Sequence, residues 1–322
     1  MIAMGYAAAM DWLTTHAVAI GAALLAALAA AVGIVVRQAA LQGPALVREM
    51  SGAVISAVLR DRLWWSGTGA AVAGYVFQAV ALAHGSLLLV QPLLVSSLLF
   101  VLPLSAWRCG SRVSAFEWAW ALLLTAALAV FVLVGRPQEG DYRPATLTWA
   151  LAVTGAVLLV VLCVLIARRT TDRVRAMSLG GAVAILLGMI AVLTKTCTHR
   201  FAVGGWHGLF SLPALYLLVL LAVGVTVLQQ WAFQAGALQA SVPVMLVGEP
   251  VVAVLLGVVV LGEQLTARGI GVVVLPAAVV AMVAATIALG RGEGAHTEEA
   301  AHSGRDPDES DPSPATGPAL RR

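Results

Sequence analysis

The sequence predicts an all-α polytopic membrane protein with about nine transmembrane helices in two inverted-topology repeats. Its 322 residues are 61% hydrophobic and only 11% charged, with a mean hydropathy of +0.95, whereas a soluble domain is about 25% charged. The apolar residues form runs of about 20, the length that a helix needs to cross a bilayer. One six-residue segment also recurs with five of its six residues unchanged, as FQAVAL at Phe77–Leu82 and FQAGAL at Phe233–Leu238. Because phenylalanine occurs only seven times in the chain, this recurrence indicates an internal repeat.

Nine apolar stretches qualify as membrane-spanning helices. They are, in chain order, Ala17–Val36, Trp65–Ala83, Ser86–Trp107, Phe116–Gly135, Ala145–Ala167, Met177–Thr196, Phe210–Ala237, Ser241–Leu261 and Gly269–Leu289. The connections after the second and the seventh stretch are very short, so each of these helices is expected to form a hairpin with the next.

The segments outside these stretches differ in composition. Residues 1–16 are expected to lie on the extracytoplasmic side. Within Pro44–Arg60 the apolar side chains fall near one helical face, which indicates an interfacial helix, although a plain loop fits the same residues. Residues 290–322 are rich in Pro, Ser, Glu and Asp and hold almost no bulky apolar side chain, so we expect a disordered cytoplasmic tail.

Basic residues predict the orientation, because cytoplasmic loops carry an excess of Lys and Arg. With the N-terminus outside, the inner connections contain Arg37, Arg48, Arg60, Arg62, Arg108, Arg112, Arg168, Arg169, Arg173 and Arg175. The outer connections contain only Arg136, Arg143, Lys195, Arg200 and Arg268. We therefore expect a protein of the cell membrane with its N-terminus outside and its C-terminus in the cytoplasm. Basic loops between apolar segments set topology, and nucleic acid is not expected as a partner.

The repeat extends beyond this one segment. Gln91-Pro92 follows Gln78 by 13 residues (91 − 78), and Glu249-Pro250 follows Gln234 by 15 (249 − 234). Each of these dipeptides lies inside the helix that comes after the repeated segment. A two-residue gap therefore aligns the two halves of the chain over at least two consecutive helices.

The alignment pairs helices one to four with helices six to nine. The first repeat covers residues 17–135 and the second covers residues 177–289. Residues 136–176 contain the fifth helix and a basic cytoplasmic loop, and they have no counterpart. An offset of five helices reverses the direction of each copy, and inverted repeats of this kind are common in secondary transporters.

One segment of the second half carries a recognisable pattern. The pattern consists of Glu249-Pro250 inside a helix, Gly262-Glu263 at its end, Arg268 in a short basic loop, and Gly269 and Gly271 in the next helix. In this respect Met245–Leu275 resembles the closing part of the EamA repeat of the drug/metabolite transporter (DMT) superfamily. The first half departs from it, since Leu104-Ser105 stands where Gly-Glu is expected. The nine helices and Trp64-Trp65 at the entry to the second helix also resemble the NIPA-type branch, which is associated with magnesium transport.

Glu249 is the first candidate for a substrate or ion site. It lies about nine residues into the eighth helix, or roughly 13 Å deep at 1.5 Å per residue. An acid near the middle of a bilayer is costly unless it is paired or faces water, so it indicates a functional site. Pro250 removes one backbone donor and leaves a carbonyl of the preceding turn free. A structural carboxylate that bonds to a neighbouring helix is the alternative.

Polar residues of the repeated segments are the next candidates. Gln91 and Pro92 are the counterparts of the acidic dipeptide in the first half, and Gln91 either lines a cavity or bonds to another helix. Gln78 and Gln234 each lie within an apolar helix and need a partner. They serve either as hydrogen-bonding contacts between helices or as part of the substrate path.

Two aromatic side chains and two charged ones complete the set. Tyr75 and Trp231 lie near the same levels and either wall a pocket or pack in the core. Lys195 is placed at a helix end, where it either extends to the interface or pairs with Glu249 in one access state. Glu263 is expected to make a helix-end or loop contact and not to bind substrate.

These features favour a secondary transporter of the DMT type that moves a small molecule or ion by alternating access. The alternative is a NIPA-like magnesium transporter, in which Glu249 would bind the metal. A purely structural membrane protein would not need Glu249. We expect no enzyme, because HExxH and GxSxG motifs are absent from the sequence, and no cofactor. The lipid bilayer is the expected environment. The sequence leaves both a monomer and a homodimer as alternatives.

Overall fold

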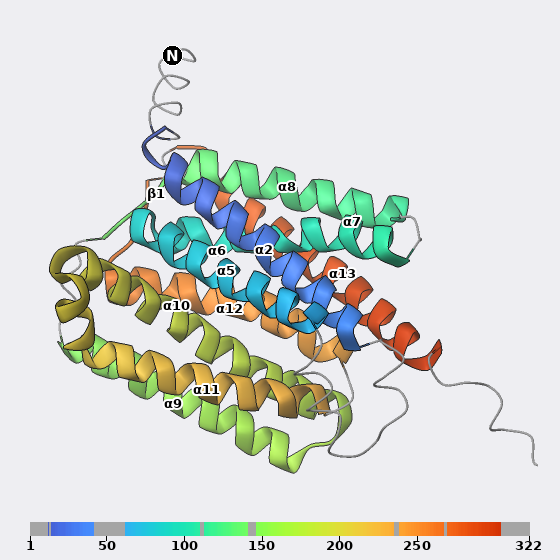
Figure 1. Ribbon diagram of the computed structural model, residues 1–322. Helices are drawn as coiled ribbons and strands as arrows, with labels where there is room; N and C mark the ends of the chain where they lie inside the picture. Colours follow the sequence, from blue (N-terminus) through green and yellow to red (C-terminus); the bar gives the residue numbers. More distant parts are fainter. Residues whose placement is uncertain are drawn as a thin grey trace, which may run out of the picture.

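The computed structural model describes residues 12, 14–41, 62–109, 113–140, 146–234, 238–266 and 269–303. They form an all-α, multi-pass membrane protein (Figure 1). Its helices are α2 (Ala17–Leu41), α5 (Arg62–His84), α6 (Leu87–Val95), α7 (Ser97–Cys109), α8 (Ala115–Gly135), α9 (Thr146–Arg169), α10 (Asp172–Phe210), α11 (Pro213–Gln234), α12 (Leu238–Leu261) and α13 (Gly271–Ser303).

Eight spans in the described residues are long and apolar enough to cross a membrane. The third of these, Leu87–Trp107, consists of α6 and α7 together, and α11 contributes a shorter apolar stretch, Pro213–Gln229. The predicted third helix is therefore interrupted. At the break, the Ser96 N–H donates to the Leu93 carbonyl at 3.1 Å instead of to the carbonyl of Pro92 four residues back, and the Ser96 hydroxyl donates to the same Leu93 carbonyl at 2.6 Å.

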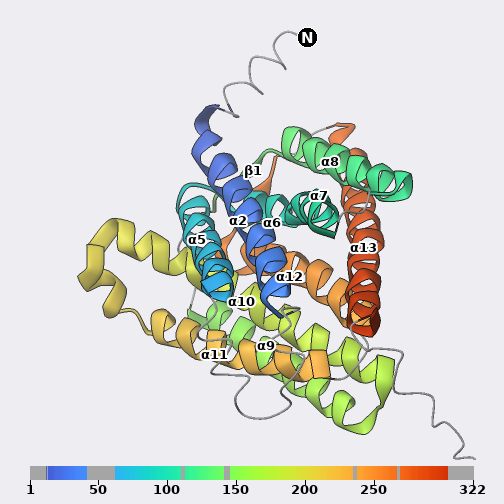
Figure 2. The same cartoon turned by 45° about the vertical axis from the view of Figure 1, so that its right-hand side comes forward.

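Two helices are longer than the sequence predicted. α10 continues past Thr196 to Phe210, with Gly205 as one non-helical residue, and this end projects from the bundle (Figure 2). α13 continues to Ser303, so the expected disorder of residues 290–322 is wrong for their first part, where Ala and Glu favour a helix. Hydropathy marks where a helix leaves the bilayer and not where its backbone hydrogen bonds end. The predicted interfacial helix Pro44–Arg60 lies outside the described residues.

The bundle is built from a few close helix pairs. α2 packs on α5, α10 packs on α11 and α12, and α8 packs on α13. Small residues allow these approaches: a Cβ added at Gly188 of α10 would lie 2.6 Å from Val252 of α12. α9 packs mainly on α10 at the edge of the bundle, and only 6% of its span is buried inside the protein.

The short helix α6 lies at the centre of the fold. Its residues from Leu87 to Val90 are fully buried, and all of them except Leu88 belong to the main hydrophobic core. The two-residue turn Gly85-Ser86 joins α6 to α5, as the predicted hairpin requires. Helix α6 also contacts α2 and α12. Helix α6 is therefore packed against helices from both halves of the chain.

A two-stranded sheet adds an element that the sequence did not predict. β1 (Pro137–Gln138) follows α8, and β2 (Gln264–Leu265) follows α12. The two pair antiparallel, and the Thr266 N–H donates to the Gly135 carbonyl at 2.9 Å. The pair joins the ends of α8 and α12 at the same end of the bundle as the α5–α6 turn.

Candidate functional site

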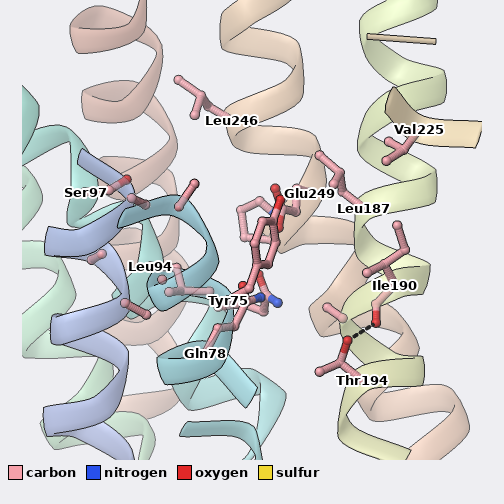
Figure 3. A pocket seen from close by; sticks show the side chains of 18 of the residues that line it. Tyr75, Gln78, Leu94, Ser97, Leu187, Ile190, Thr194, Val225, Leu246 and Glu249 are labelled. Carbon is pink, nitrogen blue, oxygen red and sulfur yellow. Dashed lines mark hydrogen bonds between the residues drawn. The ribbon is translucent and has the colours of Figure 1, made fainter. Parts of the chain in front are cut away.

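A cavity of about 690 Å³ lies within the bundle, between helices of both halves of the chain (Figure 3). Its wall is mostly alanine and branched aliphatic side chains from α2, α5, α6, α7, α10, α11 and α12. The polar side chains that line it are Tyr75, Gln78, Gln91, Ser97, Thr194, Thr226, Gln229 and Glu249. A concave, largely apolar space with a few convergent polar groups is the usual form of a small-molecule site.

Glu249 is the one charged side chain among the described residues that line this cavity. It reaches the cavity from α12, and Tyr75 and Gln78 reach it from α5 (Figure 3). Pro250 also lines the cavity. Within the described part of the chain, its carboxylate makes no hydrogen bond or ion pair. The structure thus places Glu249, Pro250, Gln78 and Tyr75 at the wall of one cavity.

Gln91 lines the same cavity from α6 and is 1% exposed. Its Nε2 is buried and has no hydrogen-bond partner among the residues that the structure describes. A buried donor without a partner costs about 1–3 kcal/mol. The amide is therefore an unsatisfied donor at the wall of a cavity.

Two threonines line the cavity that the sequence analysis did not single out. The Thr194 hydroxyl donates to the Ile190 carbonyl at 2.8 Å, and the Thr226 hydroxyl donates to the Ala222 carbonyl at 2.8 Å. Both hydroxyl protons are used within their own helices, so the oxygens offer only lone pairs to the cavity. Threonines in apolar helices commonly bond in this way, so the presence of these two in the sequence did not indicate a cavity.

Some predicted site residues do not reach the cavity. Trp231 is 46% exposed and does not line it, because it faces away from the bundle. Pro92 is buried behind Gln91 and is also absent from the wall. The side chain of Gln234 lies outside the described part of the structure.

Lys195 is placed differently from both expectations. It lies within α10 with a fully buried side chain, and it neither extends to an interface nor contacts Glu249. Its Nζ lies 3.0 Å from Oε1 of Glu139 and 3.6 Å from Oε1 of Glu263, and it donates to the Gly85 carbonyl. α10 is longer than predicted, so this position is interior and not terminal.

Glu263 makes the helix-end contact that the sequence predicted, but with a distant helix. The N–H groups of Leu87 and Leu88, at the start of α6, donate to its Oε1 and Oε2 at 2.8 and 3.0 Å. A carboxylate at a helix N-terminus is favoured by the unpaired N–H groups and the helix dipole. Burial raises the pKa of the Glu263 carboxyl, while Lys195 and the two N–H groups act in the opposite direction.

The Gly262-Glu263 dipeptide has a defined backbone role. Gly262 adopts a left-handed conformation with φ of 68°, and the Glu263 N–H donates to the Gly257 carbonyl at 3.1 Å. A left-handed glycine directly after the last helical residue is a common helix ending, and here the next N–H reaches a carbonyl six residues back. It turns the chain at the end of α12 and directs Glu263 back toward α6.

Comparison with known proteins places the chain in one family. The chain is 36% identical over 270 residues to the uncharacterized protein Cgl0250/cg0304 of Corynebacterium glutamicum, which covers 84% of this chain and 93% of that protein. The chain belongs to the family of this corynebacterial protein. No protein-family model and no solved structure matches it. The likeness to the corynebacterial protein covers most of both chains.

The polar groups of the cavity define what a bound molecule could contact. Among the described residues, no group of three or more His, Cys, Asp or Glu side chains is placed to hold a metal ion. The cavity offers one carboxylate, the amides of Gln78, Gln91 and Gln229, and several hydroxyl groups in apolar surroundings. Such a set can hold and orient a small polar or charged molecule.

Proposed function

We propose that this protein is a secondary transporter of the drug/metabolite type that moves a small molecule or ion across the cell membrane by alternating access. The observation that carries the proposal is the placement of Glu249. Its carboxylate has no described partner and lies in a cavity inside the membrane-spanning bundle. An intramembrane carboxylate at such a place indicates a substrate or ion path.

The helix packing supports two inverted repeats. In the first half α2 packs on α5 and on α6–α7, and in the second half α10 packs on the equivalent helices α11 and α12. The pairs α6–α12 and α8–α13 join the third helix to the eighth and the fourth to the ninth. A pseudo-twofold axis in the membrane plane would relate the two members of each pair. α9, the fifth helix, lies outside this scheme.

The Lys195 network supports a closed outer end. It joins Gly85 and Glu139, from connections of the first half, to Lys195 and Glu263 of the second. Along α10, Lys195 directly follows Thr194, which lines the cavity. Alternating access requires that contacts across this end break when the cavity opens to the outside.

The basic residues support the orientation. The turn between α9 and α10 is flanked by Arg168, Arg169, Arg173 and Arg175, at the end of the bundle opposite Glu263. By the positive-inside rule this end is cytoplasmic, which puts the N-terminus outside and the C-terminus inside.

Transport into proteoliposomes tests the proposal. The full-length protein would be reconstituted into lipid vesicles. Uptake of Mg²⁺, amino acids and cationic drugs into these vesicles would be measured with and without a pH gradient. We expect uptake of at least one class of compound, and a loss of at least tenfold in Glu249→Gln. Uptake restricted to Mg²⁺ would favour the NIPA-like alternative. A single cavity carboxylate supports that alternative less, because Mg²⁺ usually binds through several oxygen ligands and retained waters.

Glu117→Gln is the matched control for this experiment. Glu117 belongs to the capping box of α8 with Ser114, far from the cavity wall, and glutamine can take the same capping role. The same chemical change there should leave uptake unaltered. Equal uptake by wild type and Glu249→Gln for a true substrate would rule out a role of the cavity carboxylate in transport.

A further inference from the structure

We infer that the substrate is a protonated primary amine that also carries a hydrogen-bond acceptor oxygen, held at two points by Glu249 and Gln91. This inference rests on the proposed function, because it names the substrate class of the same cavity. It comes from four groups at the cavity wall, namely the Glu249 carboxylate, the Gln91 amide and the hydroxyls of Thr194 and Thr226.

The single negative charge at the cavity wall favours a substrate with one positive charge. Glu249 is the one ionisable carboxylate among the described lining residues, and no basic side chain described there neutralises it. Lys195, the single lysine of the sequence, does not line the cavity and bonds to Glu139, Glu263 and Gly85. A monovalent cation therefore matches the site, whereas an anion or a dication would leave charge uncompensated in apolar surroundings.

The hydroxyl oxygens select a cation that has N–H groups. Thr194 and Thr226 give their protons to Ile190 and Ala222, so toward the cavity they act as acceptors. Together with the two carboxylate oxygens of Glu249 they provide several acceptor sites. A primary ammonium has three N–H donors to satisfy them, whereas a quaternary ammonium has none.

Gln91 selects a second group on the substrate. Its Nε2 is a buried donor without a described partner, at the wall of the same cavity. An ether, hydroxyl or carbonyl oxygen of the substrate would accept this hydrogen bond. Sites that hydrogen-bond a substrate group discriminate strongly against analogues without it, because the protein group is then left unpaired.

The rest of the wall fits a compact apolar body. Ala26, Ala27, Ala30 and Ala71 line one side from α2 and α5, where their small side chains leave the space open. A volume of about 690 Å³ lies in the range of small-molecule pockets. The substrate is thus an amphipathic amine and not a bare inorganic ion.

Four matched probes test the inference by calorimetric titration of the purified full-length protein in detergent. 4-Benzyloxybutylamine has the amine and the ether oxygen. 6-Phenylhexylamine replaces that oxygen with CH₂, the N,N,N-trimethyl derivative of the first probe removes the N–H groups, and 4-benzyloxybutanol removes the charge. We expect wild type to bind the first probe at least about tenfold more tightly than each of the others.

The variants separate the two contacts. Gln91→Leu should bind the ether amine and the hydrocarbon amine about equally, and Glu249→Gln should lose the preference for the amine over the alcohol. Gln138→Leu, on the exposed strand β1, is the control and should keep both preferences. Gln91→Met is a second variant of similar length that keeps the packing of α6, and it should behave like Gln91→Leu.

The outcomes also separate this inference from the proposed function. If wild type binds none of the four probes up to millimolar concentration, or shows no preference for the ether amine, the substrate class is wrong. A preference for the ether oxygen that persists in both Gln91 variants would overturn the role of Gln91. In either case, Glu249-dependent uptake of another compound in proteoliposomes would leave the transporter proposal standing, whereas absence of all uptake would refute both.

Discussion

Lys195 and Glu263 form an ion pair in which both side chains are fully buried, with 3.6 Å between Nζ and Oε1. The pair joins α10 to the chain just after α12, and Glu263 also caps α6. Removing water from two charges is costly, and such pairs persist when further hydrogen bonds satisfy the remaining atoms. Here Glu139, Gly85, Leu87 and Leu88 supply those bonds.

Removing one member of the pair should destabilise the protein strongly. Lys195→Met leaves the buried Glu263 carboxylate without its cation, and we expect a loss of about 3–5 kcal/mol in the free energy of unfolding. Thermal unfolding in detergent measures the effect, with exposed Arg200→Met on the same helix as the control. In the double variant Lys195→Met/Glu263→Gln the two losses should not add. Additive losses would show that the two residues act independently.

Gly262 should tolerate asparagine better than alanine. Its φ of 68° is strained for a residue with a Cβ, and asparagine visits this conformation more readily than alanine. We expect Gly262→Ala to cost about 1–2 kcal/mol and Gly262→Asn to cost less. Thermal unfolding of the two variants checks this order. The reverse order would contradict the left-handed conformation of Gly262 at the end of α12.

The contact between α10 and α12 should not accept a larger residue at Gly188. A Cβ there would lie 2.6 Å from Val252, so Gly188→Val forces the helices apart, at a cost of about 1–3 kcal/mol. Gly224→Val on α11 is the matched control, because no atom lies within 4 Å of its Cβ position. Comparable melting temperatures for the two variants would argue against close packing at this site.

Glu249→Gln should separate function from stability. The Glu249 carboxylate has no described partner, so its neutralisation should leave the melting temperature unchanged or slightly higher while it reduces uptake at least tenfold. Glu263→Gln, in contrast, should lower the melting temperature, because that carboxylate bonds to Lys195, Leu87 and Leu88. A large loss of stability in Glu249→Gln would instead indicate a structural carboxylate.

The orientation can be read from cysteine labelling in intact cells. In a background without Cys109, Cys163 and Cys197, Gln138→Cys on β1 should react with a membrane-impermeant maleimide. Thr170→Cys, in the arginine-flanked turn between α9 and α10, should react only after permeabilisation. The opposite labelling pattern would invert the proposed topology.

Much of the fold followed from the sequence, because hydropathy reports directly on burial in lipid. A helix lies in each of the nine predicted apolar stretches, and the α5–α6 turn is as short as predicted. The break at Ser96, the extension of α10 to Phe210 and the β1–β2 pair did not, since they depend on local hydrogen bonds and not on apolar length.

The candidate site was predicted in part for a related reason. Glu249 is conspicuous because a carboxylate is rare inside an apolar run, and Gln78 and Gln91 stood out by their place in the repeat. The partners of Lys195 could not be deduced, because Gly85, Glu139 and Glu263 come from three separate connections. Only the folded chain shows which loop ends meet.

The exposed helix α9 has a consequence for how the chain is inserted during synthesis. It contributes little to the packed interior, since only 6% of its span is buried. Yet one additional crossing reverses the direction in which every later segment enters the bilayer. The presence of α9 therefore determines the direction in which α10 to α13 cross the membrane. Its apolar surface faces lipid and needs no protein partner.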